Sequence, residues 1–112
     1  MDGIATLPEP PYTAVIFTAR RSEKYQGYDE AAEAMVALAV QQPGYLGHES
    51  VEQADGLEIT VSYWVNDEAA RNWKKVAEHR EAQRRGREDW YSHYEIRVAR
   101  VERAYGHNQD TS

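Results

Sequence analysis

Alternating apolar and polar positions predict strands in four parts of the chain. The segment 12–20, YTAVIFTAR, is apolar on both alternating faces, which is typical of a central strand covered by helices on one face and by a second layer on the other. The segment 45–53 predicts another strand, and 57–64, LEITVSYW, alternates strictly. The short turn ADG between them favours a hairpin. A last strand is expected over 94–105, with a shift of the alternation near Ala99 that indicates a bulge.

Two stretches show the three-to-four-residue spacing of amphipathic helices. Across 28–42 the apolar positions fall on one helical face, and Pro43 ends that helix. The second helix begins at Asn66, whose side chain suits an N-cap and is followed by two acidic residues in the first turn. Arginines and then Gly86 mark its end. The segment 87–94 that follows is expected to be irregular or a short helix.

The predicted order strand, helix, strand, strand, helix, strand is that of a ferredoxin-like α+β fold. Its four-stranded antiparallel sheet would carry both helices on one face. We expect this domain over 12–105. An extended N-terminal arm over 1–11 precedes it, because successive prolines there exclude a helix or a central strand, and a flexible polar tail over 106–112 follows it.

The sheet face away from the helices is expected to be apolar as well. Ala14 and Ile16 alternate with Val15 and Phe17, so both faces of the first strand are apolar. An uncovered apolar face of this size is typical of an interaction site. Pairing two such faces around a twofold axis predicts a homodimer.

Composition narrows the classes of function. The 112 residues suit one domain, and a formal net charge of −6 with a sequence pI of about 5.2 opposes binding to nucleic acid. Cysteine is absent, which excludes thiolate metal sites and a cysteine nucleophile. The N-terminus lacks the basic and apolar regions of a signal peptide, and no apolar run is long enough for a membrane span. We therefore expect a cytoplasmic protein with no membrane partner.

The second helix carries the first group of candidate functional residues. Wound at about 100° per residue, it has an apolar stripe made of Ala69, Trp73, Val76 and Ala77. A polar line runs along the edge of this stripe and consists of Asn72, His79 and Gln83. These polar side chains either border a cavity or form the solvated flank that every amphipathic helix has. Trp73 either fills the core or lines the same cavity, or does both.

Further candidates lie outside that helix. His48 is expected to share a face with Leu46, two residues before it on the strand. If that face looks toward the helices, the imidazole there either acts as a general base near pH 7 or packs at the core edge with a hydrogen bond to the backbone. Tyr63 either donates a hydrogen bond from its phenol or simply packs. The cluster WYSHY at 90–94 suits a pocket wall or, as we favour, a dimer interface. The arginines within 80–87 either bind a carboxylate or, as we expect, stay solvated.

Several stretches resemble the antibiotic biosynthesis monooxygenase (ABM) family. The similarity covers roughly 12–105 and is carried by YTAVIF in the first strand, QQPGYLG after the first helix, SYW at the end of the third strand, and the Trp and His of the second helix. It implies a dimeric α+β barrel. It also implies a cofactor-free oxygenase or a haem-degrading monooxygenase, since one fold carries several functions.

For the cofactor-free branch, the resemblance implies an aromatic or quinol-type substrate that loses a proton and then reduces O₂ directly. The protein would supply desolvation, orientation and hydrogen bonds. The implied catalytic group is Asn72, Trp73 and His79. The substrate-binding candidates are His48, Tyr63, Trp64 and Gln83. No glycine-rich phosphate loop, HExxH or G-x-S-x-G motif offers a competing chemistry, so no cofactor or metal is expected.

Haem degradation is disfavoured, because the resemblance places an Asn in the first strand of haem-degrading members and a His ten residues after the helix Trp. Here the first strand has no Asn, and Gln83, a poor haem ligand, stands ten residues after Trp73. His79 lies only six residues after Trp73. We therefore expect a cofactor-independent monooxygenase. A non-catalytic dimeric module that binds a small hydrophobic ligand is the alternative, and a haem-binding or haem-degrading protein is the second alternative.

Overall fold

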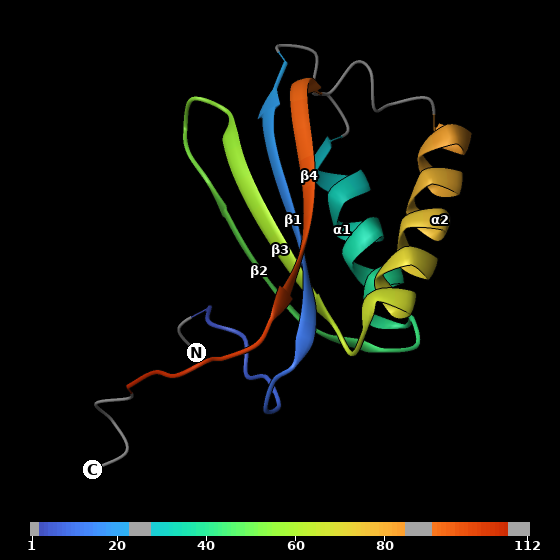
Figure 1. The fold of residues 1–112 in the computed structure, drawn as a ribbon. Coiled ribbons are helices and arrows are strands. Elements are labelled where there is room, and N and C mark those ends of the chain that lie inside the picture. The colour runs from blue at the N-terminus through green and yellow to red at the C-terminus, as the bar shows by residue number, and fades with distance from the viewer. Residues whose placement is uncertain (1–2, 23–27, 85–90, 108–112) are drawn as a thin grey trace.

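The chain folds into a four-stranded antiparallel sheet with two helices on one side of it (Figure 1). The computed structural model describes residues 3–22, 28–84 and 91–107, except the side chains of residues 28–31 and 81–84. The elements are, in order, β1 (Tyr12–Arg21), α1 (Tyr28–Val40), β2 (Tyr45–Glu52), β3 (Leu57–Trp64), α2 (Asp67–Arg84) and β4 (Tyr91–Val101). The strand order β2-β3-β1-β4 makes β1 and β3 central. The predicted ferredoxin-like α+β fold is confirmed.

The last strand departs from its predicted bounds at both ends. β4 begins at Tyr91, which pairs with Arg21, so 91–94 belongs to the strand rather than to an irregular or helical segment. It ends at Val101, before the predicted end at Tyr105. The first part of the segment predicted to be irregular, 87–90, lies outside the described residues.

The predicted bulge near Ala99 is wrong. Ala99 pairs with Ala14 within an uninterrupted ladder, and the register of β1 and β4 shifts at Arg20/Arg21 instead. β4 is an edge strand with most of its side chains exposed on both faces, so its apolar positions are not forced onto one face and their parity does not report a bulge.

The core lies between the sheet and the helices. Its centre is Trp64, at the end of β3, which has no exposed surface. Ala39 of α1 and both Ala69 and Ala70 of α2 pack around this indole. Small side chains at these helix positions let the helix backbones approach the sheet, so one large side chain fills the space between the layers. No helix within the described ranges is long and apolar enough to cross a membrane.

Two connections fix where α2 meets the sheet. Asn66 caps α2 as predicted, because its Oδ1 accepts the N–H of Ala69 at 2.9 Å. Gly44, in the turn before β2, has a φ of 85°, and its carbonyl accepts the N–H of Val65 at 2.8 Å. A Cβ at Gly44 would stand 2.6 Å from the Cβ of Ala69. Both the positive φ and the close approach therefore require glycine here.

We call the side of the sheet away from the helices the open face. Trp64 points to the helices, so its neighbour Tyr63 points to the open face, and the register of the strands assigns the other residues by alternation. The open face comprises Tyr12, Ala14, Ile16, Thr18, Arg20, Gly47, Glu49, Val51, Leu57, Ile59, Val61, Tyr63, His93, Glu95, Arg97, Ala99 and Val101. Both helices lie on the opposite side, as Figure 1 shows. The predicted apolar second face is therefore present.

Candidate functional site

An aromatic cluster occupies the space between the sheet and α2. Trp64 of β3 and Trp73 of α2 stack with ring centroids 5.7 Å apart and planes at 20°. Tyr45, at the start of β2, meets Trp64 edge to face at 5.7 Å. Offset stacks and edge-to-face contacts are the arrangements that aromatic pairs prefer. We call these residues, together with His48, the interlayer aromatic cluster.

His48 joins the cluster through a hydrogen bond. Its Nδ1 lies 2.5 Å from the phenol oxygen of Tyr45. Desolvation by burial raises the pKa of Tyr45, so this phenol keeps its proton throughout the neutral range. In the tautomer with a proton on Nδ1, that N–H donates to Tyr45 and leaves Nε2 free to accept a proton. His48 therefore has the geometry of a positioned imidazole.

A bulge in β2 makes this pairing possible. Tyr45 lies opposite Trp64 and Gly47 lies opposite Tyr63, so Leu46 is the extra residue between them. The bulge turns Tyr45 and His48, three residues apart, to the same helix-facing side. Tyr45 was not predicted as a neighbour of His48, because strict alternation pairs His48 with Leu46, and the residue pattern carries no signal for a bulge at this position.

The members of the cluster differ in how accessible they are. Trp64 is fully buried, and its indole N–H donates to the Oγ of Ser62 at 2.9 Å, so its polar atom is satisfied. Trp73 and His48 are half-buried. A small molecule in contact with the cluster would therefore meet Trp73 and His48, while Trp64 supports Trp73 from behind.

A second aromatic group lies on the same side of the sheet. Phe17 of β1 contacts Tyr91 edge to face at 5.3 Å and stacks on Tyr94 at 5.7 Å. Ile96 and Val98 of β4 share this side, opposite Phe17 and Val15 in the register, and both are exposed. The helix-facing side near β4 thus presents accessible apolar side chains. For WYSHY, the structure puts Tyr91 and Tyr94 toward the helices, and Trp90 lies outside the described residues.

The polar line predicted on α2 differs in exposure from the predicted apolar stripe. Asn72 and His79 are exposed, whereas the predicted stripe of Ala69, Trp73, Val76 and Ala77 is buried or half-buried. The side chain of Gln83 lies outside the described residues. The stripe is therefore confirmed as the core-facing side of α2. A catalytic role for Asn72 and His79 stays a prediction.

Tyr63 lies on the other side of the sheet from the cluster. Its phenol donates to Oε1 of Glu49 at 2.6 Å, and its ring meets Tyr12 edge to face at 5.7 Å. Burial and the hydrogen bond to the Glu49 carboxylate raise the pKa of Tyr63 to about 12. A phenol so placed is a fixed hydrogen-bond donor of the open face. It does not reach the same space as His48.

The described residues hold no group of three or more His, Asp or Glu side chains arranged as metal ligands. At the surface of α2, Nε of Arg71 forms an ion pair with Oδ2 of Asp67 at 2.7 Å. Arg80 is half-buried, and the later arginines of the 80–87 group lie outside the described side chains. What the described site offers is aromatic surface, one imidazole and one neutral phenol.

Comparison with known proteins places this chain in a family. The chain is 52% identical over 103 residues, 92% of its length and 90% of the relative's, to YqjZ of Bacillus subtilis (strain 168), an uncharacterized protein. Its fold matches that of SnoaB, a cofactor-independent oxygenase from Streptomyces nogalater, with a TM-score of 0.66 and 14% identity over 85% of this chain and 97% of that one. A protein from Shewanella oneidensis matches with a TM-score of 0.71 and 8% identity over 90% and 100% of the two chains.

These two structural matches show the fold alone. The family is shown by the sequence, because the model of the family described as antibiotic biosynthesis monooxygenase matches residues 11–85. That range runs from the start of β1 to the end of α2 and contains every member of the interlayer aromatic cluster. The chain belongs to the antibiotic biosynthesis monooxygenase family.

Proposed function

We propose that this protein is a cofactor-independent monooxygenase that acts on a small aromatic or quinol-type compound. The observation that carries the proposal is the hydrogen-bonded Tyr45–His48 pair beside the Trp64–Trp73 stack, in a chain of this family. A stack of rings binds a flat aromatic molecule, and an imidazole removes a proton from it near neutral pH. SnoaB, which has the same fold, is a cofactor-independent oxygenase, and this supports the proposal.

The reaction needs only the substrate, O₂ and a base. A methylene or hydroxyl group activated by an aromatic ring loses a proton to Nε2 of His48, and the resulting anion transfers electrons to O₂. At a methylene carbon, one oxygen atom ends as the new carbonyl oxygen, and the other leaves as water with the two hydrogens of that carbon. A phenol or quinol that loses its hydroxyl proton takes up one oxygen atom at a ring carbon to give a quinone, and the other oxygen atom leaves as water with two hydrogens of the substrate. In both cases the substrate is the reductant, so the atoms and electrons balance without a cofactor.

Each residue of the cluster then has a distinct part. His48 accepts the proton, and Tyr45 holds its Nδ1 so that Nε2 is presented to the substrate. Trp73 offers the accessible ring face and excludes water, which strengthens the electrostatic interactions at the reacting atoms. Trp64 keeps Trp73 in place. Asn72 and His79 form a second candidate set on the exposed side of α2.

Oxygen uptake by the purified protein with a panel of hydroquinones and anthrones tests the proposal. We expect uptake with at least one compound. His48→Ala should lower the rate by about a hundredfold or more, the usual contribution of a general base, and His107→Ala, an exposed residue outside the matched family range, should not change it. If only His79→Ala loses oxygen uptake, His79 on the exposed side of α2 would be the base in place of His48. No uptake with any compound would remove the proposal.

A non-catalytic module that binds a small hydrophobic ligand is the second candidate function. The observation in its favour is that Asn72 and His79, the predicted catalytic side chains of α2, are both exposed. Quenching of tryptophan fluorescence by the same compounds, without oxygen uptake, would support this alternative. A haem titration that leaves the Soret band unshifted would dispose of the haem-binding alternative.

We also propose that the protein is a homodimer that pairs through the open face. That face carries exposed aliphatic side chains such as Ile59 and Val51. It also carries Glu95 and Arg97, which are two residues apart on β4 and therefore neighbours on this face. A twofold axis that passes between these two positions would bring Glu95 of each copy toward Arg97 of the other.

A further inference from the structure

The N-terminal arm, residues 3–11, lies against one end of the open face. Ala5 and Leu7 are half-buried, whereas Ile4 and Thr6 are exposed. This alternation is typical of an extended segment that lies with one side on a surface. All but the last residue of this arm precede the part of the chain that the family model matches, residues 11–85. The proposed reaction does not use the arm.

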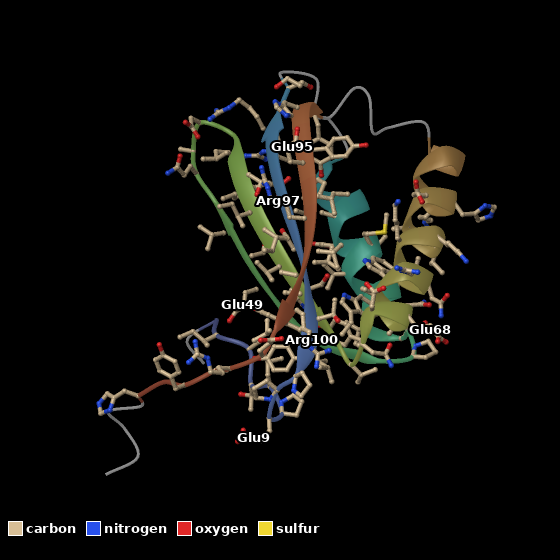
Figure 2. The ribbon with its side chains drawn as sticks, viewed as in Figure 1. Glu9, Glu49, Glu68, Glu95, Arg97 and Arg100 are labelled. Carbon is tan, nitrogen blue, oxygen red and sulfur yellow. The ribbon has the colours of Figure 1, made fainter. Side chains whose placement is uncertain are left out.

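Glu49 holds the arm in place. Its Oε2 accepts the backbone N–H of Ala5 at 3.1 Å, and its Oε1 accepts the phenol of Tyr63 at 2.6 Å. One carboxylate thus ties the arm to β3, and Tyr12 closes the end of this site by its edge-to-face contact with Tyr63. Figure 2 shows Glu49 on the side of the sheet away from the helices.

Gly47 leaves room for the arm. It lies opposite Tyr63 on the open face, and a Cβ there would stand 3.2 Å from Cδ2 of Leu7 and 3.3 Å from Cβ of Ala5. These distances are tighter than ordinary packing, so the arm sits directly on the glycine. The absence of a side chain at Gly47 and the two hydrogen bonds of Glu49 are independent signs that the sheet is built to receive this segment.

The arm changes what the open face offers to a partner. Two sheets that pack face to face stand about 10 Å apart, and side chains fill that space. A chain segment lying on one sheet occupies the same space, so the end near Gly47 and Tyr63 is closed to a second sheet. The end around Ile59, which is 44% exposed, is left uncovered.

We propose that the N-terminal arm is a strap, fastened by Glu49, that closes one end of the open face and restricts a second copy of this chain to the end around Ile59. This inference rests on the homodimer proposed above. The second copy is the partner that fits, because the uncovered end combines aliphatic side chains with the self-complementary pair Glu95 and Arg97. Release of the strap would let the two sheets overlap further and bind more tightly.

Hydrogen exchange of the Ala5 amide, followed by NMR, tests the fastening. In the unaltered chain the exchange should be at least about tenfold slower than in an unstructured peptide, as expected for a hydrogen bond to a carboxylate. Glu49→Ala should abolish the slowing. Glu52→Ala, which removes the same charge from β2 but from a pair with Arg21, should preserve it. Exchange at the unstructured rate in the unaltered chain would overturn the strap.

Sedimentation of two proline variants tests the consequence. Ala5→Pro removes the N–H that Glu49 accepts and leaves the sheet unchanged, whereas Thr6→Pro stiffens the same segment at an exposed position. We expect the Kd of self-association to fall about tenfold or more for Ala5→Pro and to stay within about twofold for Thr6→Pro. An unchanged or higher Kd for Ala5→Pro would contradict the restriction.

A chain that is monomeric at every concentration would also overturn the docking on Ile59, whatever the Ala5 exchange shows. Neither result depends on oxygen uptake. Failure of the strap and failure of the proposed reaction are therefore distinguishable.

Discussion

At the scale of single residues, the bond between Tyr63 and Glu49 depends on the phenol keeping its proton. The pKa of Tyr63 is about 12 in the folded chain, against about 10 for an unperturbed tyrosine. The folded state therefore holds this proton more tightly than the unfolded state. The stabilisation that results is fully present below pH 10 and is lost as the pH rises toward 12.

Tyr63→Phe should accordingly change the alkaline limb of the stability profile. Below about pH 10 the unaltered chain should be more stable than the variant by a constant amount, and the difference should shrink between about pH 10 and 12. Urea unfolding at a series of pH values measures this difference. Two curves that stay parallel up to pH 12 would show that the proton of Tyr63 is not linked to folding.

Residue roles were predictable where they depend on local sequence. Asn66 follows a strand and precedes two acids and an apolar stripe, and it is the cap that this pattern predicts. Tyr45 was not predictable, because its position beside His48 follows from a bulge at Leu46. The need for a glycine at position 44 was not predictable either, because the 2.6 Å approach of the Ala69 Cβ comes from tertiary packing.

At the scale of elements, α2 connects the core to the candidate site, since Trp73 stands on it. Its first turn is held by the Asn66 cap, which lies next to the Ala69 and Ala70 contacts with Trp64. Weakening the cap should therefore loosen the layer that carries Trp73.

Asn66→Ala should lower the free energy of unfolding by about 1 kcal/mol, the usual effect of losing an N-cap side chain. Asn66→Asp keeps an acceptor at the same place and adds a charge that the helix dipole favours, so it should be at least as stable as the unaltered chain. Urea unfolding monitored by tryptophan fluorescence gives both values. Equal stability of the alanine and aspartate variants would show that the side chain does not cap α2.

The elements differ in how well their sequence predicts them. β3, LEITVSYW, was predicted with its observed bounds, because one of its faces meets the core and the other is the open face. β4 was misplaced at both ends and given a bulge that it does not have. An edge strand pairs on one side only, so its bounds follow from the length of β1 rather than from its own alternation.

At the scale of the whole molecule, the sheet has two different faces. One meets the helices and holds the interlayer aromatic cluster, and the other is partly covered by the N-terminal arm. The order of elements was enough to predict this division. The distribution of the candidate side chains over the two faces was not, since Tyr63 and His48 lie on neighbouring strands and point to opposite sides.

If the homodimer pairs through the open face, a charge introduced on that face should weaken self-association, and a charge on the helix-facing side should not. Ile59 on the open face and Ile96 on the helix-facing side of β4 are the same residue type with nearly equal exposure, 44% and 43%. Ile59→Arg should raise the Kd of self-association by tenfold or more, about 1.4 kcal/mol or more, while Ile96→Arg should leave it unchanged. Sedimentation equilibrium measures both. An equal effect of the two variants would place the contact elsewhere.

Oxygen uptake with paired histidine variants shows whether the interlayer aromatic cluster is the catalytic site. If the interlayer aromatic cluster is the site, purified protein consumes O₂ with an aromatic or quinol-type compound. His48→Ala would then lose about a hundredfold or more of that rate, and His107→Ala would retain all of it. Uptake that survives intact in His48→Ala, or no uptake with any compound of the panel, would show that the cluster does not catalyse this reaction.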